Sequence, residues 1–148
     1  MQNPLVELIE RELNQLGVSN AKLVHESFSP QSFGNAEAIY RLGNLQLRFL
    51  RNRSDDTLSI GSSSNPRHFY NIEDVAVWMG WISLDDLLKY NTPIRFDQPP
   101  PGPFFTLPKA MSLIVKDLKL LDKAFSPSEI LSTHAKLKDA ERKRMSAR

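Results

Sequence analysis

Apolar residues recur at helical spacing near the start of the chain, and the period changes to two further on. One face of the first segment collects its apolar side chains: Leu5, Leu8, Ile9, Leu13 and Leu16. Asn3 followed by Pro4 is typical of a helix start. The Asn side chain accepts a hydrogen bond from a free backbone N–H group of the first turn, where the N–H that proline lacks would have no partner. Gly17 favours a left-handed helix end. The pattern predicts an amphipathic helix from Pro4 to about Leu16.

Alternating apolar and polar residues predict an antiparallel sheet after this helix. The sequence Leu42-Gly43-Asn44-Leu45 has the chemistry of a two-residue type II′ hairpin turn, with glycine at the first central position. Pairing outward from the turn places six residues on one face, which we expect to be buried: Leu42 against Leu45, Tyr40 against Leu47, and Ala38 against Phe49.

The opposite face of this hairpin is mixed in character. It pairs Arg41 with Gln46 and Ile39 with Arg48, and it places Glu37 diagonal to Arg48. Residues 23–28 form a possible preceding strand, and residues 57–61 alternate again as a further strand of a meander.

Helical patterns return in the second half of the chain. Asn71 and Ser83 are plausible N-caps for helices over residues 72–79 and 84–90, and Gly80 ends the first of these. Residues 91–108 contain six of the ten prolines and are expected to form an extended internal connection. A mostly apolar segment over residues 109–125 follows, and Ser126-Pro127-Ser128-Glu129 predicts the start of a final helix through a capping box.

These elements predict an α+β fold in a single domain, residues 1–148. We expect an N-terminal helix, a three- to four-stranded antiparallel meander sheet and about four C-terminal helices. No targeting segment is recognisable in the first thirty residues, and the most apolar stretch, residues 75–82, is far shorter than the roughly 18 residues of a membrane span. The chain contains no cysteine, which excludes disulfides and thiolate metal sites and is compatible with the cytoplasm, where we expect the protein.

The net charge of +2 conceals an asymmetry along the chain. Residues 1–100 carry nine basic and twelve acidic residues, whereas residues 101–148 carry ten and five. Residues 136–148 alone hold six basic and two acidic residues. Such a segment either binds nucleic acid or another polyanion, or is a solvated helix end whose positive charges suit the helix dipole. Because apolar periodicity fades after Ala140, we expect residues 141–148 to be a basic, frayed tail.

Few residues suggest catalysis or metal binding. His25, His68 and His134 lie far apart in sequence, with no second histidine at a metal-binding spacing. The adjacent carboxylates on the predicted helices diverge by about 100°, so they do not form catalytic dyads by themselves. We therefore expect no enzyme activity, no metal and no cofactor.

The segment from Val75 to the helix after Ser83 has the spacing of a helix-turn-helix. Its second helix begins Leu84-Asp85-Asp86, and these carboxylates would repel phosphates, which disfavours DNA reading. Two alternatives remain: acids that stabilise their own helix starts, or a surface that binds a basic partner. The residues of that predicted surface are Glu73, Asp74, Trp81, Asp85 and Asp86.

The middle of the chain resembles small bacterial immunity proteins of polymorphic-toxin and contact-dependent growth inhibition systems. The resemblance covers about residues 45–76 and lies in Leu45-Gln46-Leu47-Arg48-Phe49-Leu50-Arg51-Asn52-Arg53, Leu58-Ser59-Ile60-Gly61-Ser62 and Phe69-Tyr70-Asn71-Ile72-Glu73-Asp74-Val75. It implies a bacterial protein that binds and neutralises a cognate toxin domain without catalysis. A basic nuclease domain is one toxin that the acidic surface would suit.

A different class of function remains open beside this one. The chain could be a nucleic-acid-associated or regulatory protein that uses its basic C-terminal helix, although we do not expect nucleic acid or a membrane as partner. If the acidic residues serve only their own helices, the outer face of the hairpin, with Glu37, Arg41 and Arg48, is the next candidate contact surface.

Overall fold

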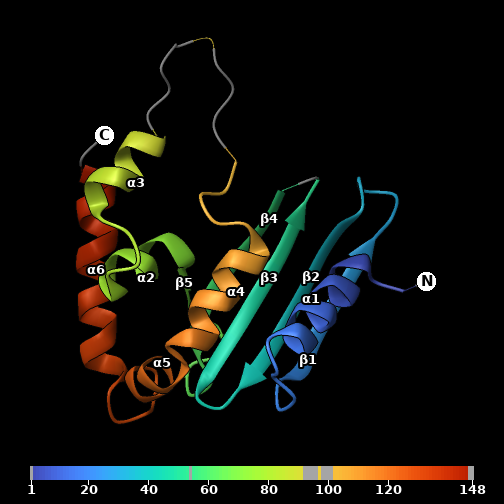
Figure 1. The fold of residues 1–148 in the computed structure, drawn as a ribbon, viewed down its shortest axis with the longest axis horizontal. Helices are drawn as coiled ribbons and strands as arrows, with labels where there is room; N and C mark the ends of the chain where they lie inside the picture. Colours follow the sequence, from blue (N-terminus) through green and yellow to red (C-terminus); the bar gives the residue numbers. More distant parts are fainter. Residues whose placement is uncertain (1, 54, 92–96, 98–101, 147–148) are drawn as a thin grey trace.

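The computed structural model describes residues 2–53, 55–91, 97 and 102–146. This part of the chain has six helices and one five-stranded antiparallel sheet, which is an α+β architecture (Figure 1). The elements in chain order are α1 (Pro4–Gln15), β1 (Lys22–Ser29), β2 (Asn35–Leu42), β3 (Leu45–Asn52), β4 (Asp55–Ser62), β5 (Phe69–Asn71), α2 (Ile72–Met79), α3 (Leu84–Asn91), α4 (Leu107–Lys116), α5 (Leu118–Ala124) and α6 (Ile130–Ser146).

The sheet is a meander in the order β1-β2-β3-β4-β5. The predicted hairpin register is confirmed, with Tyr40 opposite Leu47 and Ala38 opposite Phe49. The expectation of three or four strands missed β5, which is only three residues long and pairs with residues 59–61 of β4. A strand this short shows no alternation that a sequence pattern can detect.

Helices cover one face of the sheet. In Figure 1, α1 and α4 lie in front of the strands, and α2 and α6 lie beyond β5. The sheet residues that face α1 and α4 are buried, among them Leu47 at 3% exposure and Phe49 at 0%. They join residues of α1, α2, α4, α5 and α6 in one hydrophobic core.

Most predicted helix ends are confirmed by their caps. The Asn3 side chain accepts from the Leu5 N–H, and Asn71 and Ser83 cap the next two predicted helices in the same way. Gly80 ends α2 in the left-handed conformation. The segment 109–125 is instead divided into α4 and α5 at Asp117, where the backbone leaves helical geometry.

The turn between β2 and β3 docks on α5. The Asn44 N–H donates to Asp122 Oδ1 at 2.7 Å, and the Asn44 side chain donates to the Asp122 carbonyl at 3.1 Å. Gly43 has a φ of 61°, and a Cβ on it would lie 2.4 Å from Asp122 Oδ1. This turn therefore needs glycine both for its conformation and for its close approach to α5.

The C-terminal segment differs from the expected frayed tail. Residues 141–146 are the last turns of α6, and Arg144 is bound to Asp74 of α2. The expectation of fraying is therefore wrong for these residues, because apolar periodicity does not reveal an ion pair with a distant helix. Residues 147 and 148 lie outside the described part of the chain.

The Pro-rich connection has narrower limits than residues 91–108. Asn91 belongs to α3, and α4 begins at Leu107 with Thr106 as its N-cap. Residues 92–96 and 98–101, where the extended conformation was expected, lie outside the described residues. Among the helices described, none combines the length and the apolar character needed to cross a membrane.

Candidate functional site

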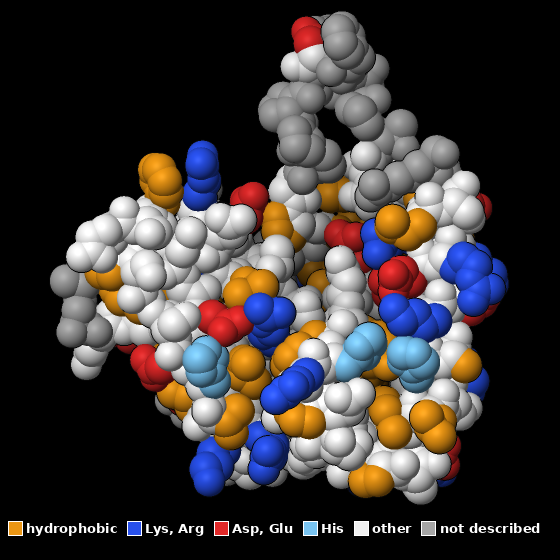
Figure 2. Space-filling view, turned by 180° about the vertical axis from the view of Figure 1, so that it is seen from behind, with side chains coloured by type: hydrophobic (Ala, Val, Ile, Leu, Met, Phe, Trp, Pro, Cys, Tyr) orange, Lys and Arg blue, Asp and Glu red, His pale blue; other side chains and the backbone are white. Residues whose placement is uncertain are grey.

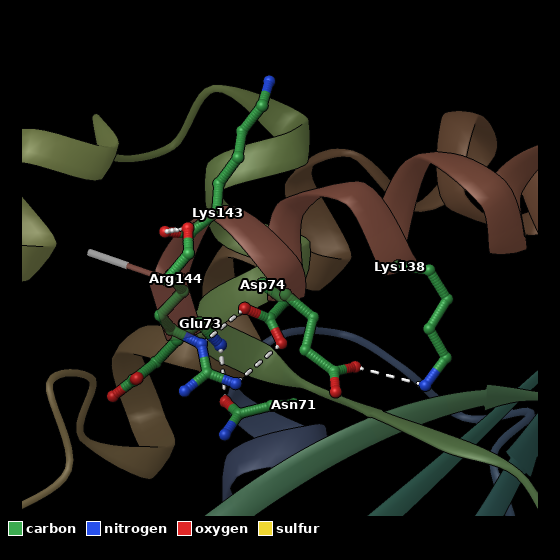
Figure 3. Close-up of polar contacts among 8 residues, drawn as sticks. Asn71, Glu73, Asp74, Lys138, Lys143 and Arg144 are labelled. Carbon is green, nitrogen blue, oxygen red and sulfur yellow. Dashed lines mark hydrogen bonds and ion pairs between the residues drawn. The ribbon is translucent and has the colours of Figure 1, made fainter. Parts of the chain in front are cut away.

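Asp74 is not part of an exposed acidic surface, because only 4% of the residue is accessible to solvent. Both of its carboxylate oxygens accept hydrogen bonds from Arg144, from Nε at 2.7 Å and from Nη2 at 3.1 Å (Figure 3). The hydrogen bond to Asp74 also raises the pKa of Arg144. Asp74 is therefore corrected from a surface residue to the buried half of an ion pair that joins α2 to α6.

Trp81 also has an intramolecular role. Its indole Nε1–H donates to Asp117 Oδ2 at 2.6 Å, and the ring packs at the margin of the core. This contact ties the connection between α2 and α3 to the break between α4 and α5. The indole N–H is therefore already bound within the chain and is not free to contact a partner, as the predicted surface would need.

The other three predicted residues remain accessible. Glu73 is half-buried in the first turn of α2, and Asp85 and Asp86 are exposed in the first turn of α3. Acids at these positions stabilise the positive ends of their helix dipoles. Without Asp74 and a free Trp81, the structure does not assemble the five residues into the surface that we expected.

The basic residues of α6 are largely neutralised within the chain. Of the five basic residues in α6, four have an acidic neighbour, and these pairs are Lys138–Glu141, Arg142–Asp139, Lys143–Asp139 and Arg144–Asp74. Pairing reduces the positive potential that a polyanion would meet. The arrangement therefore gives the nucleic-acid alternative little support.

The sheet face opposite α1 and α4 carries the other candidate surface. None of the helices that the structure describes lies over this face, which is seen in Figure 2 from the side opposite to Figure 1. The register places on it Glu37, Ile39 and Arg41 of β2, Gln46, Arg48 and Leu50 of β3, His25 of β1 and Phe69 of β5. Gln46 is buried, with 3% exposure, so the open part of the face lies toward the other end of β3. This is the outer face of the predicted hairpin, extended by strands on both sides.

A polar network crosses three strands of this face. Glu37 Oε1 lies 2.9 Å from His25 Nε2, and Glu37 Oε2 accepts from Arg48 Nε at 2.7 Å. The Arg48 guanidinium also lies over the Phe69 ring, 5.6 Å from its centroid. The predicted proximity of Glu37 and Arg48 is confirmed. Sequence reasoning missed the contributions of His25 and Phe69.

Beyond this network, the face is cationic and partly apolar. Lys22 and Arg41 are exposed neighbours across β1 and β2, and Glu37 is already engaged by His25 and Arg48. Ile39 and Leu50 are half-buried between these groups. In the middle of Figure 2, hydrophobic side chains lie among cationic and histidine side chains.

A shallow hollow of about 420 Å³ lies at one end of the same face. It is bordered by β1, β2 and β3, and its lining includes Ser27, Ser29, Asn35, Leu50 and Asn52. The lining is mostly small and polar, with the Leu50 side chain as an apolar element. The candidate surface is therefore slightly concave where it approaches the β1–β2 and β3–β4 turns.

A separate aromatic cluster joins the sheet to α6. Tyr70 OH is within hydrogen-bond distance of His134 Nδ1, and His68 stacks edge-on against both rings. Burial is the main cause that lowers the pKa of His68, and it raises the pKa of Tyr70. His134 of α6 thus packs against Tyr70 of the sheet. The described residues hold no group of three His, Asp or Glu side chains placed to bind a metal ion.

Comparison of the chain with protein-family models, with curated proteins and with solved structures finds no match.

Proposed function

We propose that this chain is a binding protein without catalysis, of the immunity class that residues 45–76 resemble, and that it contacts its partner through the uncovered face of the sheet. One observation carries the choice of surface. Helices cover one face of the sheet, whereas the opposite face keeps half-buried apolar side chains at the surface in the described part of the chain. Apolar side chains framed by hydrogen-bonded charges are typical of protein interfaces.

The charges of the face indicate the character of its partner. Because Glu37 is paired with His25 and Arg48, the charged side chains left on this face are Lys22, Arg41 and the exposed part of Arg48, with one exposed carboxylate, Asp55, at the start of β4. Opposite potentials accelerate association and select the correct partner. The complementary surface is therefore acidic, in contrast to the basic nuclease cleft that the sequence suggested.

The size of the face sets a further requirement. Strands of eight residues are about 26 Å long, and four of them span roughly 19 Å at the usual spacing. Their projected area is roughly 500 Å². A standard interface buries ~800 Å² of accessible surface on each partner, so a partner of that size would use most of this face together with its margin.

The experiment uses the toxin domain encoded by a neighbouring gene as the partner. The wild-type chain should bind the purified domain with a measurable Kd and should restore growth to a bacterial host that produces it. Absence of both binding and protection would overturn the immunity function.

The surface is tested with two sets of variants. Lys22→Glu with Arg41→Glu should weaken the Kd at least tenfold with little change in the melting temperature, because both side chains are exposed on the uncovered face. Asp85→Lys with Asp86→Lys is the matched charge-reversal control and should bind as the wild type does. The opposite pattern would place the contact on α3 and refute the choice of the sheet face.

A further inference from the structure

The turn between β1 and β2 presents an unusual residue. Ser32 to Asn35 form a tight turn in which the Asn35 N–H donates to the Ser32 carbonyl at 3.1 Å. Its two central residues, Phe33 and Gly34, have φ values of 60° and 73°. Positive φ at both central positions is the mark of a type I′ turn, which favours asparagine, aspartate or glycine at the position that phenylalanine occupies here.

Arg53, in the turn between β3 and β4, contacts Phe33 and its turn. Arg53 is the other non-glycine residue with positive φ in the described part of the chain, at 60°. Its N–H donates to Asn35 Oδ1 at 2.7 Å, which joins the two turns. Its guanidinium lies over the Phe33 ring, 4.7 Å from the centroid. Two turns 20 residues apart in sequence are thus joined, and Arg53 of one lies against the exposed aromatic ring of the other.

Stability of the fold does not account for Phe33. The side chain is 73% exposed and takes no part in the hydrophobic core. A bulky residue in the left-handed region is strained, and a cation–π contact between exposed groups compensates only weakly. Exposure and conformation therefore both disfavour phenylalanine here, and such outliers concentrate where a residue serves binding.

The position of Phe33 relates it to the uncovered face. In an antiparallel meander the β1–β2 and β3–β4 turns lie at the same end of the sheet (Figure 1). The hollow on the uncovered face ends there too, since Ser29, Asn35 and Asn52 line it next to these turns. The ring and the face are thus parts of one continuous surface.

We propose that Phe33 and Arg53 form the anchor of the partner contact. Phe33 enters an apolar pocket on the partner protein, and Arg53 pairs with a carboxylate at the rim of that pocket. Hot spots of interfaces are enriched in aromatic and arginine side chains, and a side chain that is already oriented before binding loses less entropy when it binds. The inference rests on the proposed function and extends the contact from the sheet face to the turns at its end.

The test combines binding and stability. Phe33→Asn suits the turn better than phenylalanine, so its melting temperature should equal or exceed that of the wild type. Its Kd for the toxin domain encoded by the neighbouring gene should be at least tenfold weaker. Leu131→Asn is the matched control, because Leu131 is 83% exposed on α6, and its Kd should not change. Arg53→Gln should weaken binding, and its effect should be smaller in the Phe33→Asn background, because the two side chains act as a unit.

The outcomes separate this inference from the function on which it rests. If the wild type binds and Phe33→Asn binds equally well, the anchor is refuted and the proposed function stands. A markedly lower melting temperature for Phe33→Asn would also refute the anchor, since Phe33 would then stabilise the fold. If the wild type does not bind the toxin domain, the proposed function fails and the anchor fails with it.

Discussion

Replacing Arg144 by methionine tests the ion pair that joins the end of α6 to α2. The side chains of Asp74 and Arg144 are 5% and 15% exposed, and two hydrogen bonds connect them. Methionine keeps most of the aliphatic volume of arginine and removes its charge. The substitution therefore leaves the Asp74 carboxylate buried without a partner, while most of the packing of α6 is retained.

The size of the effect follows from the cost of an unpaired buried charge. Removing one partner of a buried ion pair usually destabilises a protein by about 3–5 kcal/mol. Arg144 lies in the last turn of α6, so the helix end can move aside and let water reach Asp74. We therefore expect the lower end of this range, about 3 kcal/mol. Deleting residues 142–148 should cost at least as much, whereas a frayed tail would be dispensable.

Urea unfolding followed by far-UV circular dichroism measures this change in the free energy of unfolding. Arg142→Met is the matched control, because Arg142 is 75% exposed and lies 3.9 Å from its partner Asp139. Its effect should stay within about 0.5 kcal/mol. The double variant Asp74→Asn with Arg144→Met should be clearly more stable than the two single changes predict together. If Arg144→Met and Arg142→Met cost the same, the reasoning about the buried pair is wrong.

Three further predictions concern the core, a turn and pH. Leu47→Ala should destabilise the protein by about 2–5 kcal/mol in urea unfolding, because Leu47 is 3% exposed beneath the helices; a loss below about 1 kcal/mol would contradict its place in the core. Gly43→Ala should lower the melting temperature more than Gly17→Ala does. Both positions have positive φ, but only at Gly43 does the new Cβ meet Asp122, and equal effects would exclude that clash. Burial and neighbouring positive charges lower the pKa of His68 below its ordinary 6.5, so the fold favours the neutral ring. Its contribution to stability should be complete above about pH 6.5 and should be lost as the pH falls below that value, and His68→Phe should reduce this pH dependence of unfolding.

The candidate surface shows where sequence reasoning succeeds and where it stops. The alternation of β2 and β3, together with the turn at Gly43, was enough to place Glu37 near Arg48. The addition of His25 depends on the β1–β2 register, which shifts at a bulge between Leu23 and His25. A bulge reverses the face of every residue beyond it, so alternation alone does not assign the face.

Side-chain contacts between distant segments cannot be predicted from sequence patterns. Nothing in the sequence indicates that Arg53 lies over Phe33, because two separate turns must first be placed side by side. Asp74 looked like a surface acid because a helix start explains it equally well. In a sequence, a charge that will be buried with a partner looks the same as one that will be solvated.

Sequence patterns alone were enough to predict the features that depend on neighbouring residues: α1 and its cap, the β2–β3 register, the ends of α2 and the α+β class. Their signals lie within a few residues, since propensity, capping and alternation act locally. The break of the helix at Asp117 and the docking of the end of α6 on α2 are seen only in the three-dimensional structure. These features arise from contacts between residues as many as 70 positions apart in the sequence, and there packing and burial override local preference.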